Sequence, residues 1–195
     1  KEGYSPASII IDSPIIFKEK KDSFDRWKPV NFEEKFYGPT SLRTALTHSR
    51  NIVTVKLMQK IGIKGTIRLA RKLGITSNME RNLSISLGSA ETTLLKLTSA
   101  YSAFVNGGKL VNPILIDRIQ DSEGKTIFNN DKRKCINCDQ ISYLGKDYPV
   151  IKNNYQTVFS PQTAYQMTSI LEGVVQRGTA KKIKDLKLNI AGKTG

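Results

Sequence analysis

Hydrophobic positions divide the chain into helical stretches that are separated by polar and glycine-rich segments. Residues 42–49 carry leucine, alanine and finally serine at helical spacing, which predicts a short helix with one apolar face. Residues 52–61 are apolar on most sides and predict a buried helix that ends at Gly62. The two helices meet at the polar tripeptide Ser49-Arg50-Asn51. Because buried polar side chains need hydrogen-bond partners, we interpret the tripeptide either as helix caps or as the wall of a cleft.

The same patterns predict the other elements of the chain. Ser160 and Pro161 are a good N-cap and first helical residue, and their helix is expected to end at Gly178. Apolar stripes expected in the core are formed by Leu94, Leu97, Tyr101 and Phe104 on one helix and by Ala164, Met167, Leu171 and Val174 on another. Further elements are expected at residues 8–14 (strand), 66–73 (helix), 83–89 (short strand or extended turn), 92–105 (helix), 110–128 (β-hairpin) and 188–195 (strand). Residues 129–155 are polar without a clear period, which indicates an excursion from the core.

The composition is ordinary for a globular protein, but the net charge of +14 is high. Lysine and arginine are scattered along the whole chain and are not interleaved with aromatic residues, so we expect no nucleic-acid partner. A solvated basic surface facing anionic lipid or cell-wall polymer is favoured instead. No apolar run approaches the ~18 residues of a membrane span. Both ends are abrupt, so we interpret the chain as a piece of a longer protein.

The two cysteines form a single Cys-x-x-Cys pair, Cys135 and Cys138. A structural zinc site needs four ligands, and the only histidine, His48, is far away in the sequence, so no metal site is expected. A redox motif would follow a strand and open a helix, which this polar stretch does not do. The favoured interpretation is a local disulfide, and a reduced surface pair is the alternative.

Candidate chemistry appears at the end of the chain, in Lys193-Thr194-Gly195. Glycines on both sides of the lysine and threonine leave the backbone bare, as a strand edge needs where a ligand chain lies against it. A lysine there can bind a carboxylate or lower the pKa of a hydroxyl, and the threonine hydroxyl can bond the same carboxylate. Standing alone, the tripeptide is equally well explained as an exposed basic strand end.

Ser-x-Asn followed by Lys-Thr-Gly is the second and third motif of the penicilloyl serine transferases. Beyond these motifs, the chain resembles the transpeptidase domain of class A, bifunctional penicillin-binding proteins, close to the 1A type. The resemblance covers nearly every residue except 129–155. The matching stretches are residues 3–8, 12–14, 27–31, 38–39, 42–43, 45–46, 49–52, 70–75, 87–89, 100–101, 106–108, 177–180 and 191–195.

The resemblance implies an α+β, mostly helical fragment of the fold that these transpeptidases share with serine β-lactamases. Most of the central sheet is expected to be missing. Residues 1–195 would be one partial transpeptidase domain that contains the 129–155 excursion. The parent protein is expected at the periplasmic face of the bacterial inner membrane, anchored there and carrying an upstream glycosyltransferase domain.

The implied activity is peptidoglycan cross-linking by D,D-transpeptidation through an acyl-enzyme on serine, without a cofactor. The implied partners are peptidoglycan stem peptides and β-lactam antibiotics, which would trap the acyl-enzyme. By resemblance, Ser49 would shuttle the proton to the leaving group, and Asn51 would hydrogen-bond the substrate amide and the lysine of the first motif. Lys193, the third catalytic residue, would position the substrate carboxylate together with Thr194, and the strand through Gly195 would line the substrate backbone.

One departure from the family pattern concerns the nucleophile. A Ser-x-x-Lys occurs at Ser122 and Lys125, but it falls in an expected hairpin turn, whereas the family motif opens a helix. We expect the true motif shortly before Lys1, and the 195 residues alone are expected to be inactive. His48 adjoins Ser49, but sequence neighbours rarely face one another on a helix, so a surface or packing role is expected.

Three rival interpretations remain open. A non-enzymatic β-lactam sensor or scaffold on the same fold would keep both motifs without the transfer step. A basic nucleic-acid-binding domain would show affinity that falls steeply with salt. A stand-alone serine β-lactamase fits the stretches 100–108 and 177–180 less well than the synthases do.

Overall fold

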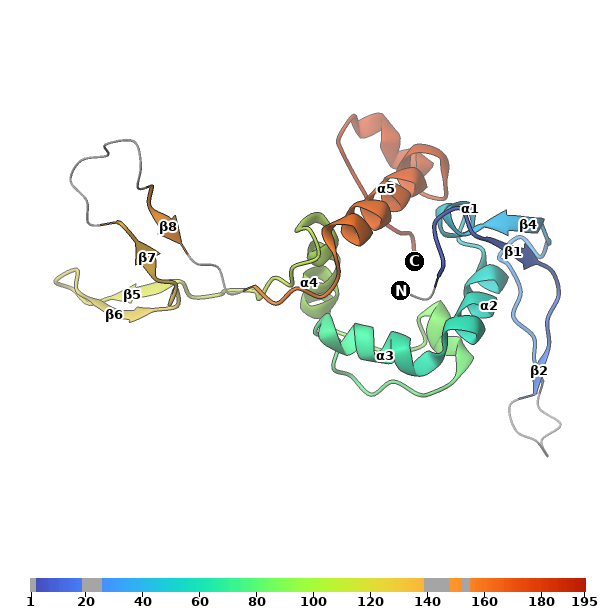
Figure 1. Cartoon of the computed structure of the whole chain (residues 1–195), viewed down its shortest axis with the longest axis horizontal. Coiled ribbons are helices and arrows are strands. Elements are labelled where there is room, and N and C mark those ends of the chain that lie inside the picture. Colours follow the sequence, from blue (N-terminus) through green and yellow to red (C-terminus); the bar gives the residue numbers. More distant parts are fainter. Residues whose placement is uncertain (1–2, 19–25, 139–147, 152–154) are drawn as a thin grey trace.

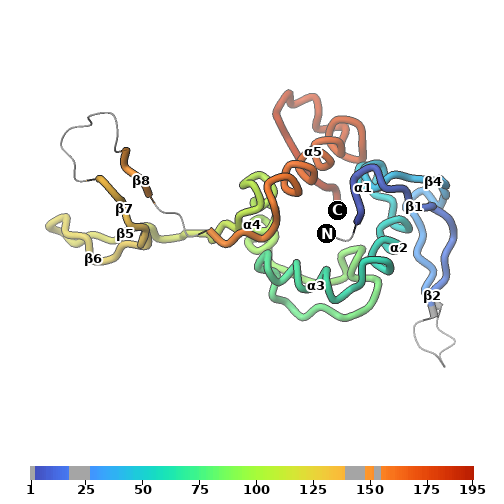
Figure 2. The backbone as a smooth tube through the Cα atoms, in the orientation of Figure 1, coloured from blue at the N-terminus to red at the C-terminus, as the bar shows by residue number. Residues whose placement is uncertain are grey.

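The computed structural model describes residues 3–18, 26–138, 148–151 and 155–195. The helices form a ring-like body, and two hairpins extend from one side of it (Figures 1 and 2). The helices are α1 (Leu42–Thr47), α2 (Asn51–Ile61), α3 (Ile63–Lys72), α4 (Leu94–Val105) and α5 (Pro161–Arg177), with the 3-10 helices η1 (Leu83–Leu87) and η2 (Lys181–Leu186). The strands are β1 (Ile9–Asp12), β2 (Phe17–Lys18), β3 (Arg26–Trp27), β4 (Gly38–Ser41), β5 (Arg118–Gln120), β6 (Thr126–Asn129), β7 (Cys135–Ile136) and β8 (Val150–Ile151).

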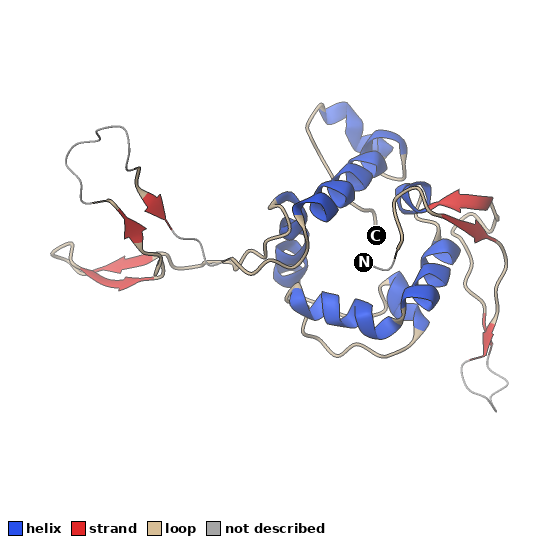
Figure 3. Cartoon of the chain, in the orientation of Figure 1, coloured by secondary structure: helices blue, strands red, loops and turns tan. Residues whose placement is uncertain are grey.

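Two parts of the molecule are named by these elements. The helical body comprises the described residues 3–18, 26–110 and 155–195, with α1–α5, β1 and β4, and the β arm comprises residues 111–138 and 148–151, with β5–β8. Among the described residues, all strands form two-stranded antiparallel sheets: β1 with β4, β2 with β3, β5 with β6, and β7 with β8. Figure 3 shows the helices gathered in the body and the strands at its two sides. The fold is therefore α+β and mostly helical with only small sheets, as the sequence predicts.

The core of the body lies where α2 and α5 pack near α1. Ile52, Val53 and Val55 of α2 have no exposed surface, and Val174 of α5 is equally buried. The buried face expected on the last helix is confirmed for Ala164, Leu171 and Val174, whereas Met167 is only partly buried. α2 ends at Gly62, whose φ of 86° closes the helix as predicted.

The apolar stripe predicted on α4 is not the main buried face of that helix. Leu94 is 81% exposed, and Leu97 and Tyr101 also lie on the surface. The buried side of α4 is made of Ala100 and Ala103, which cluster with Leu73 and partly buried Ile75, Val158 and Phe159. The small alanine side chains allow this close packing, and Leu94, Leu97 and Tyr101 face outward. Phe104, the fourth residue of the predicted stripe, is partly buried and stacks on Phe159, with 5.2 Å between the ring centroids.

Two segments differ from the predicted secondary structure. The stretch around Leu83–Leu87 is a 3-10 helix closed by Gly88, because the Gly88 N–H donates to the Ile85 carbonyl rather than to a neighbouring strand. Residues 188–195 are not a strand, because they have no ladder partner among the described residues. The Gly192 N–H donates instead to the carbonyl of Leu171, in the interior of the long helix α5, at 3.3 Å.

The β arm is more ordered than the sequence indicates. The predicted hairpin is present in a shorter form, with β5 and β6 flanking the turn at residues 121–125. The pairing of β7 with β8 lies inside the 129–155 excursion, where no period was found. Residues 139–147 and 152–154 of that excursion lie outside the described residues.

Candidate active site

The site is built around the junction of α1 and α2. Ser41 caps α1 by accepting a hydrogen bond from the Thr44 N–H, and the helix ends at Thr47, two residues before the serine that was expected to continue its face. The Arg50 N–H donates to the Ala45 carbonyl at 2.8 Å and the Ser49 N–H to the Leu46 carbonyl at 3.3 Å. This is a Schellman cap, whose residue after the cap adopts a left-handed conformation.

Ser49 occupies that left-handed position with a φ of 54°. Glycine is the usual residue there, because a Cβ in this conformation is strained. A glycine would form the same helix cap with less backbone strain than this serine does. Such strain concentrates at functional sites, so the conformation favours a role for the Ser49 side chain beyond capping.

Lys193 brings the end of the chain to this junction. Its Nζ donates to Ser49 Oγ at 2.9 Å and to the carbonyl of Thr194 at 2.7 Å. Partial burial lowers the pKa of the Lys193 ammonium from its ordinary value of 10.5. The structure thus joins the two candidate motifs, which lie 144 residues apart in the sequence.

The segment that follows α5, which ends at Arg177, holds these motifs together. The Thr179 N–H donates to the Thr47 carbonyl at 3.4 Å, and the hydroxyls of Thr179 and Thr194 lie 2.7 Å apart. Gly178 packs so closely on the end of α1 that a Cβ there would collide with the Thr47 carbonyl oxygen. The sequence Arg-Gly-Thr-Ala at residues 177–180 therefore has a steric reason for its glycine.

Asn51 lies at the first residue of α2 with its side chain fixed. Its Nδ2 donates to the Val30 carbonyl at 3.0 Å. Because a carbonyl can only accept, this contact assigns the amide nitrogen to Val30 and turns Oδ1 to the other side. The Oδ1 atom is then oriented as an acceptor for an amide N–H or an ammonium group.

A cavity of about 400 Å³ opens in front of these groups. It is lined by Phe32, Glu33, His48, Ser49, Arg50, Asn51, Thr179, Thr194 and Gly195. Four of the five predicted site residues thus line one cavity, and the fifth, Lys193, is hydrogen-bonded to Ser49. His48, for which a surface or packing role was expected, also lines the cavity. Sequence reasoning missed Phe32, Glu33 and Thr179, although Thr179 lies in a stretch that matches the family.

The Ser-x-x-Lys sequence in the β arm, which was not expected to be the nucleophile motif, lies far from the cavity. Ser122 and Lys125 belong to the turn between β5 and β6, where the Asp121 carboxylate accepts from the Glu123 and Lys125 N–H groups. Gly124 adopts a φ of 83° in that turn. A serine and a lysine in this hairpin turn do not share one face of a helix, as the motif requires.

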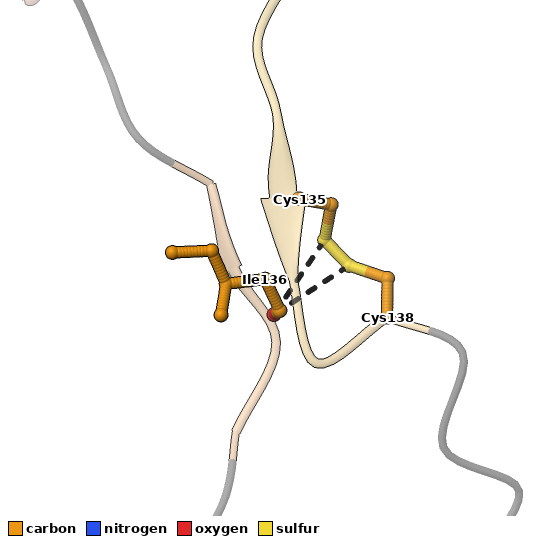
Figure 4. The surroundings of a disulfide bond; sticks show 3 residues. All are labelled: Cys135, Ile136 and Cys138. Carbon is orange, nitrogen blue, oxygen red and sulfur yellow. Dashed lines mark hydrogen bonds between the residues drawn. A yellow bond between two sulfur atoms is a disulfide. The ribbon is translucent and has the colours of Figure 1, made fainter.

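The cysteine pair lies on the β arm. A disulfide joins Cys135 and Cys138, with 5.8 Å between the two Cα atoms, around the exposed strand β7 (Figure 4). Among the described residues, no group of three or more histidine, cysteine or acidic side chains is placed to hold a metal ion. The same residues contain no helix that is long and apolar enough to cross a membrane.

The comparisons with known proteins agree with this geometry. The family model described as the penicillin binding protein transpeptidase domain matches residues 1–195, so the chain belongs to this family. The chain is 38% identical over its whole length to penicillin-binding protein 1A of Rickettsia bellii, and 32% identical over 99% of its length to that of Pseudomonas aeruginosa. It spans 25% and 27% of these two relatives.

Solved structures show the same fold. The crystal structure of penicillin-binding protein 1A from Haemophilus influenzae superposes with a TM-score of 0.77 and 29% identity, over 94% of this chain and 30% of that one. The PonA1 protein from Mycobacterium tuberculosis in complex with penicillin V matches 89% of this chain and 43% of that one, with a TM-score of 0.67. Its identity of 18% supports the fold alone.

Proposed function

We propose that this chain is part of the D,D-transpeptidase domain of a class A penicillin-binding protein of the 1A type. The domain would cross-link peptidoglycan stem peptides through an acyl-enzyme on serine, and β-lactams would inhibit it. The observation that carries the proposal is the hydrogen bond between Lys193 and Ser49 at the wall of the cavity, because it joins the second and third motifs of this enzyme class.

The proposed reaction has two transfers. A serine hydroxyl attacks the carbonyl carbon of the penultimate D-Ala, the amide bond breaks, and the terminal D-Ala leaves as an amine that takes up one proton. An acceptor amine then attacks the ester carbonyl, the ester bond breaks as the new amide forms, and one proton of the acceptor amine passes to the serine oxygen. This nucleophile is the serine of a Ser-x-x-Lys motif that we place upstream of the present residues, so the 195 residues alone would not acylate.

The present residues would bind the donor peptide and move its proton. Ser49 Oγ accepts a hydrogen bond from Lys193 Nζ, so its own O–H is left to donate toward the leaving amine. Asn51 Oδ1 would accept from the donor amide N–H and from the lysine of the first motif. Lys193 and Thr194 would hold the terminal carboxylate, and the bare backbone at Gly195 would lie along the donor chain.

The rest of the parent protein is part of the proposal. Because the 1A relatives are about four times longer than this chain, there is room in them for a membrane anchor and a glycosyltransferase domain. We place the parent protein at the periplasmic face of the inner membrane of a bacterium. Its excess of basic residues would then face anionic lipid or cell-wall polymer.

The test uses the full-length parent protein with a stem peptide that ends in D-Ala-D-Ala and an acceptor amine. Mass spectrometry should detect free D-Ala and a cross-linked dimer, and the variant Lys193→Ala should produce neither. Acylation by a β-lactam without any release of D-Ala would instead identify a sensor or scaffold. Absence of both reactions would contradict the proposal altogether.

A further inference from the structure

The cavity has one aromatic side chain at its mouth. Phe32 is 95% exposed, although burying such a ring is normally favourable. Among the described residues that line the cavity, Phe32 has the only apolar side chain. Gly195 has no side chain, and the others offer hydroxyl, amide, imidazole or charged groups. Isolated exposed aromatic residues are common on protein surfaces. Phe32 therefore indicates a functional role only if its position is fixed.

The turn that carries Phe32 is anchored at its base. Asn31 is 1% exposed, and its Nδ2 donates to both carboxylate oxygens of Asp12, at 3.0 and 2.8 Å, and to the Lys35 carbonyl at 2.8 Å. Its Oδ1 accepts from the Ile52 N–H at 3.3 Å. These contacts tie the turn both to β1 and to the first turn of α2, directly beside the site.

Arg50, the middle residue of the Ser-Arg-Asn tripeptide, anchors the other side of the same turn. Its guanidinium forms an ion pair with Glu33 and lies over the ring of Tyr37, with 3.4 Å between Cζ and the ring centroid. The Tyr37 hydroxyl donates to Glu33 Oε2 at 2.8 Å. Together with Arg50, this hydroxyl lowers the pKa of Glu33 below its ordinary value, which keeps the carboxylate charged.

We propose that Phe32 is a specificity-determining residue that binds the apolar part of the ligand's acyl side chain, and that Arg50, Glu33 and Tyr37 position it. This inference rests on the proposed function. The polar end of the ligand would lie on Lys193 and Thr194, and an aryl or alkyl group would pack on the fixed ring at the other rim of the cavity. Holding the ring in advance lowers the entropy cost of that contact.

The experiment compares two β-lactams in the full-length parent protein. Benzylpenicillin carries an aryl side chain, and aminopenicillanic acid is the same bicyclic carboxylate without it. The readout is the ratio of their acylation rate constants. Phe32→Ala should lower the ratio of benzylpenicillin to aminopenicillanic acid about tenfold, since the aromatic contact and its buried area are both lost. Phe32→Tyr keeps the ring and should retain the ratio.

A matched control and a positioning variant complete the test. Phe128→Ala, on the exposed β6 strand, should change neither rate. Tyr37→Phe removes the hydrogen bond to Glu33 but keeps the ring under Arg50, and should lower the ratio about threefold. A merely structural role of Tyr37 would slow both β-lactams equally and leave the ratio unchanged.

The outcomes separate this inference from the proposed function. If Phe32→Ala slows both β-lactams by one factor, or slows neither, the specificity role is wrong while the transpeptidase proposal stands. If the unmodified parent protein reacts with neither β-lactam, the proposed function itself fails.

Discussion

The helical body and the β arm differ in what holds their side chains. Among the described residues, every buried hydrophobic side chain lies in the body, whereas every side chain from residue 111 to 136 is exposed. The body is fixed by packing between elements that are far apart in the sequence, and the arm by local turns and pairs of short strands. The candidate chemistry lies only in the body, where packing fixes a side chain to the precision that a site needs.

The two lysines that precede a threonine provide the sharpest test of this difference. Lys193→Ala in the parent protein should lower the acylation rate on the order of a thousandfold. The substitution removes the hydrogen-bond partner of Ser49 and the ammonium group that would bind the ligand carboxylate. Lys125→Ala removes the lysine of the Ser-x-x-Lys sequence in the turn of the β arm. Equal rates for the two variants, measured with a fluorescent penicillin, would remove the distinction between the two regions.

Two isoleucines compare the stability of the same regions. Ile52 in α2 has no exposed surface, and Ile127 in β6 is 64% exposed. Ile52→Ala should lower the free energy of unfolding by about 3 kcal/mol through lost burial and a cavity. Ile127→Ala should change it by less than about 0.5 kcal/mol. Denaturant unfolding of the parent protein measures both, and a larger effect in the arm would show that it has an unseen packing partner.

Ser49→Gly separates stability from activity within the body. Glycine fits the left-handed position better, so the variant should gain about 1 kcal/mol of stability. It also loses the hydroxyl bonded to Lys193, and the acylation rate should fall about a hundredfold. A variant that is both less stable and fully active would contradict the roles given to this residue.

Burial of Lys193 has a consequence for pH. Because its pKa is lowered from 10.5, the ammonium that binds the carboxylate is lost earlier, and acylation should decline at a pH below 10.5. Stability should change in the opposite sense. The folded state loses the proton before the unfolded state does, so stability rises as the pH increases from the folded pKa toward 10.5. Acylation that remains constant through that range would mean that the charge of Lys193 is not needed.

The smallest effect is expected for the cysteine pair. We predict a disulfide between Cys135 and Cys138, so thiol titration of the unfolded parent chain should detect these two thiols only after reduction. Replacing both by serine should leave the acylation rate within about twofold, because none of the described residues of the arm lines the cavity. A loss of activity in this variant would couple the arm to the site.

Most of the body could be predicted from the sequence because its signals are local. Helical periodicity and end residues located α1, α2 and α5, with Ser41, Gly62 and Ser160 at or near the predicted ends. The two motifs identified the residues that meet at the cavity. Their contact could not be derived from periodicity, since it depends on the turn at Gly178 packing against Thr47.

The errors share one physical cause. Apolar spacing on α4 predicts a buried face without saying which side has a partner, and the structure packs the alanine side. Alternation at residues 188–195 predicts a strand, but a strand also needs a neighbour to pair with. Phe32 gave no signal at all, because an exposed aromatic is recognised only when the cavity beside it is known.

We propose that Ser49 serves a nucleophile that lies outside these residues. The most direct measurement incubates a fluorescent penicillin with the 195-residue chain and, in parallel, with the parent protein, followed by denaturing electrophoresis and intact-mass analysis. We expect a covalent adduct on the parent protein, mapped to a serine upstream of Lys1, and none on the shorter chain. An adduct on the 195-residue chain that survives denaturation would contradict it.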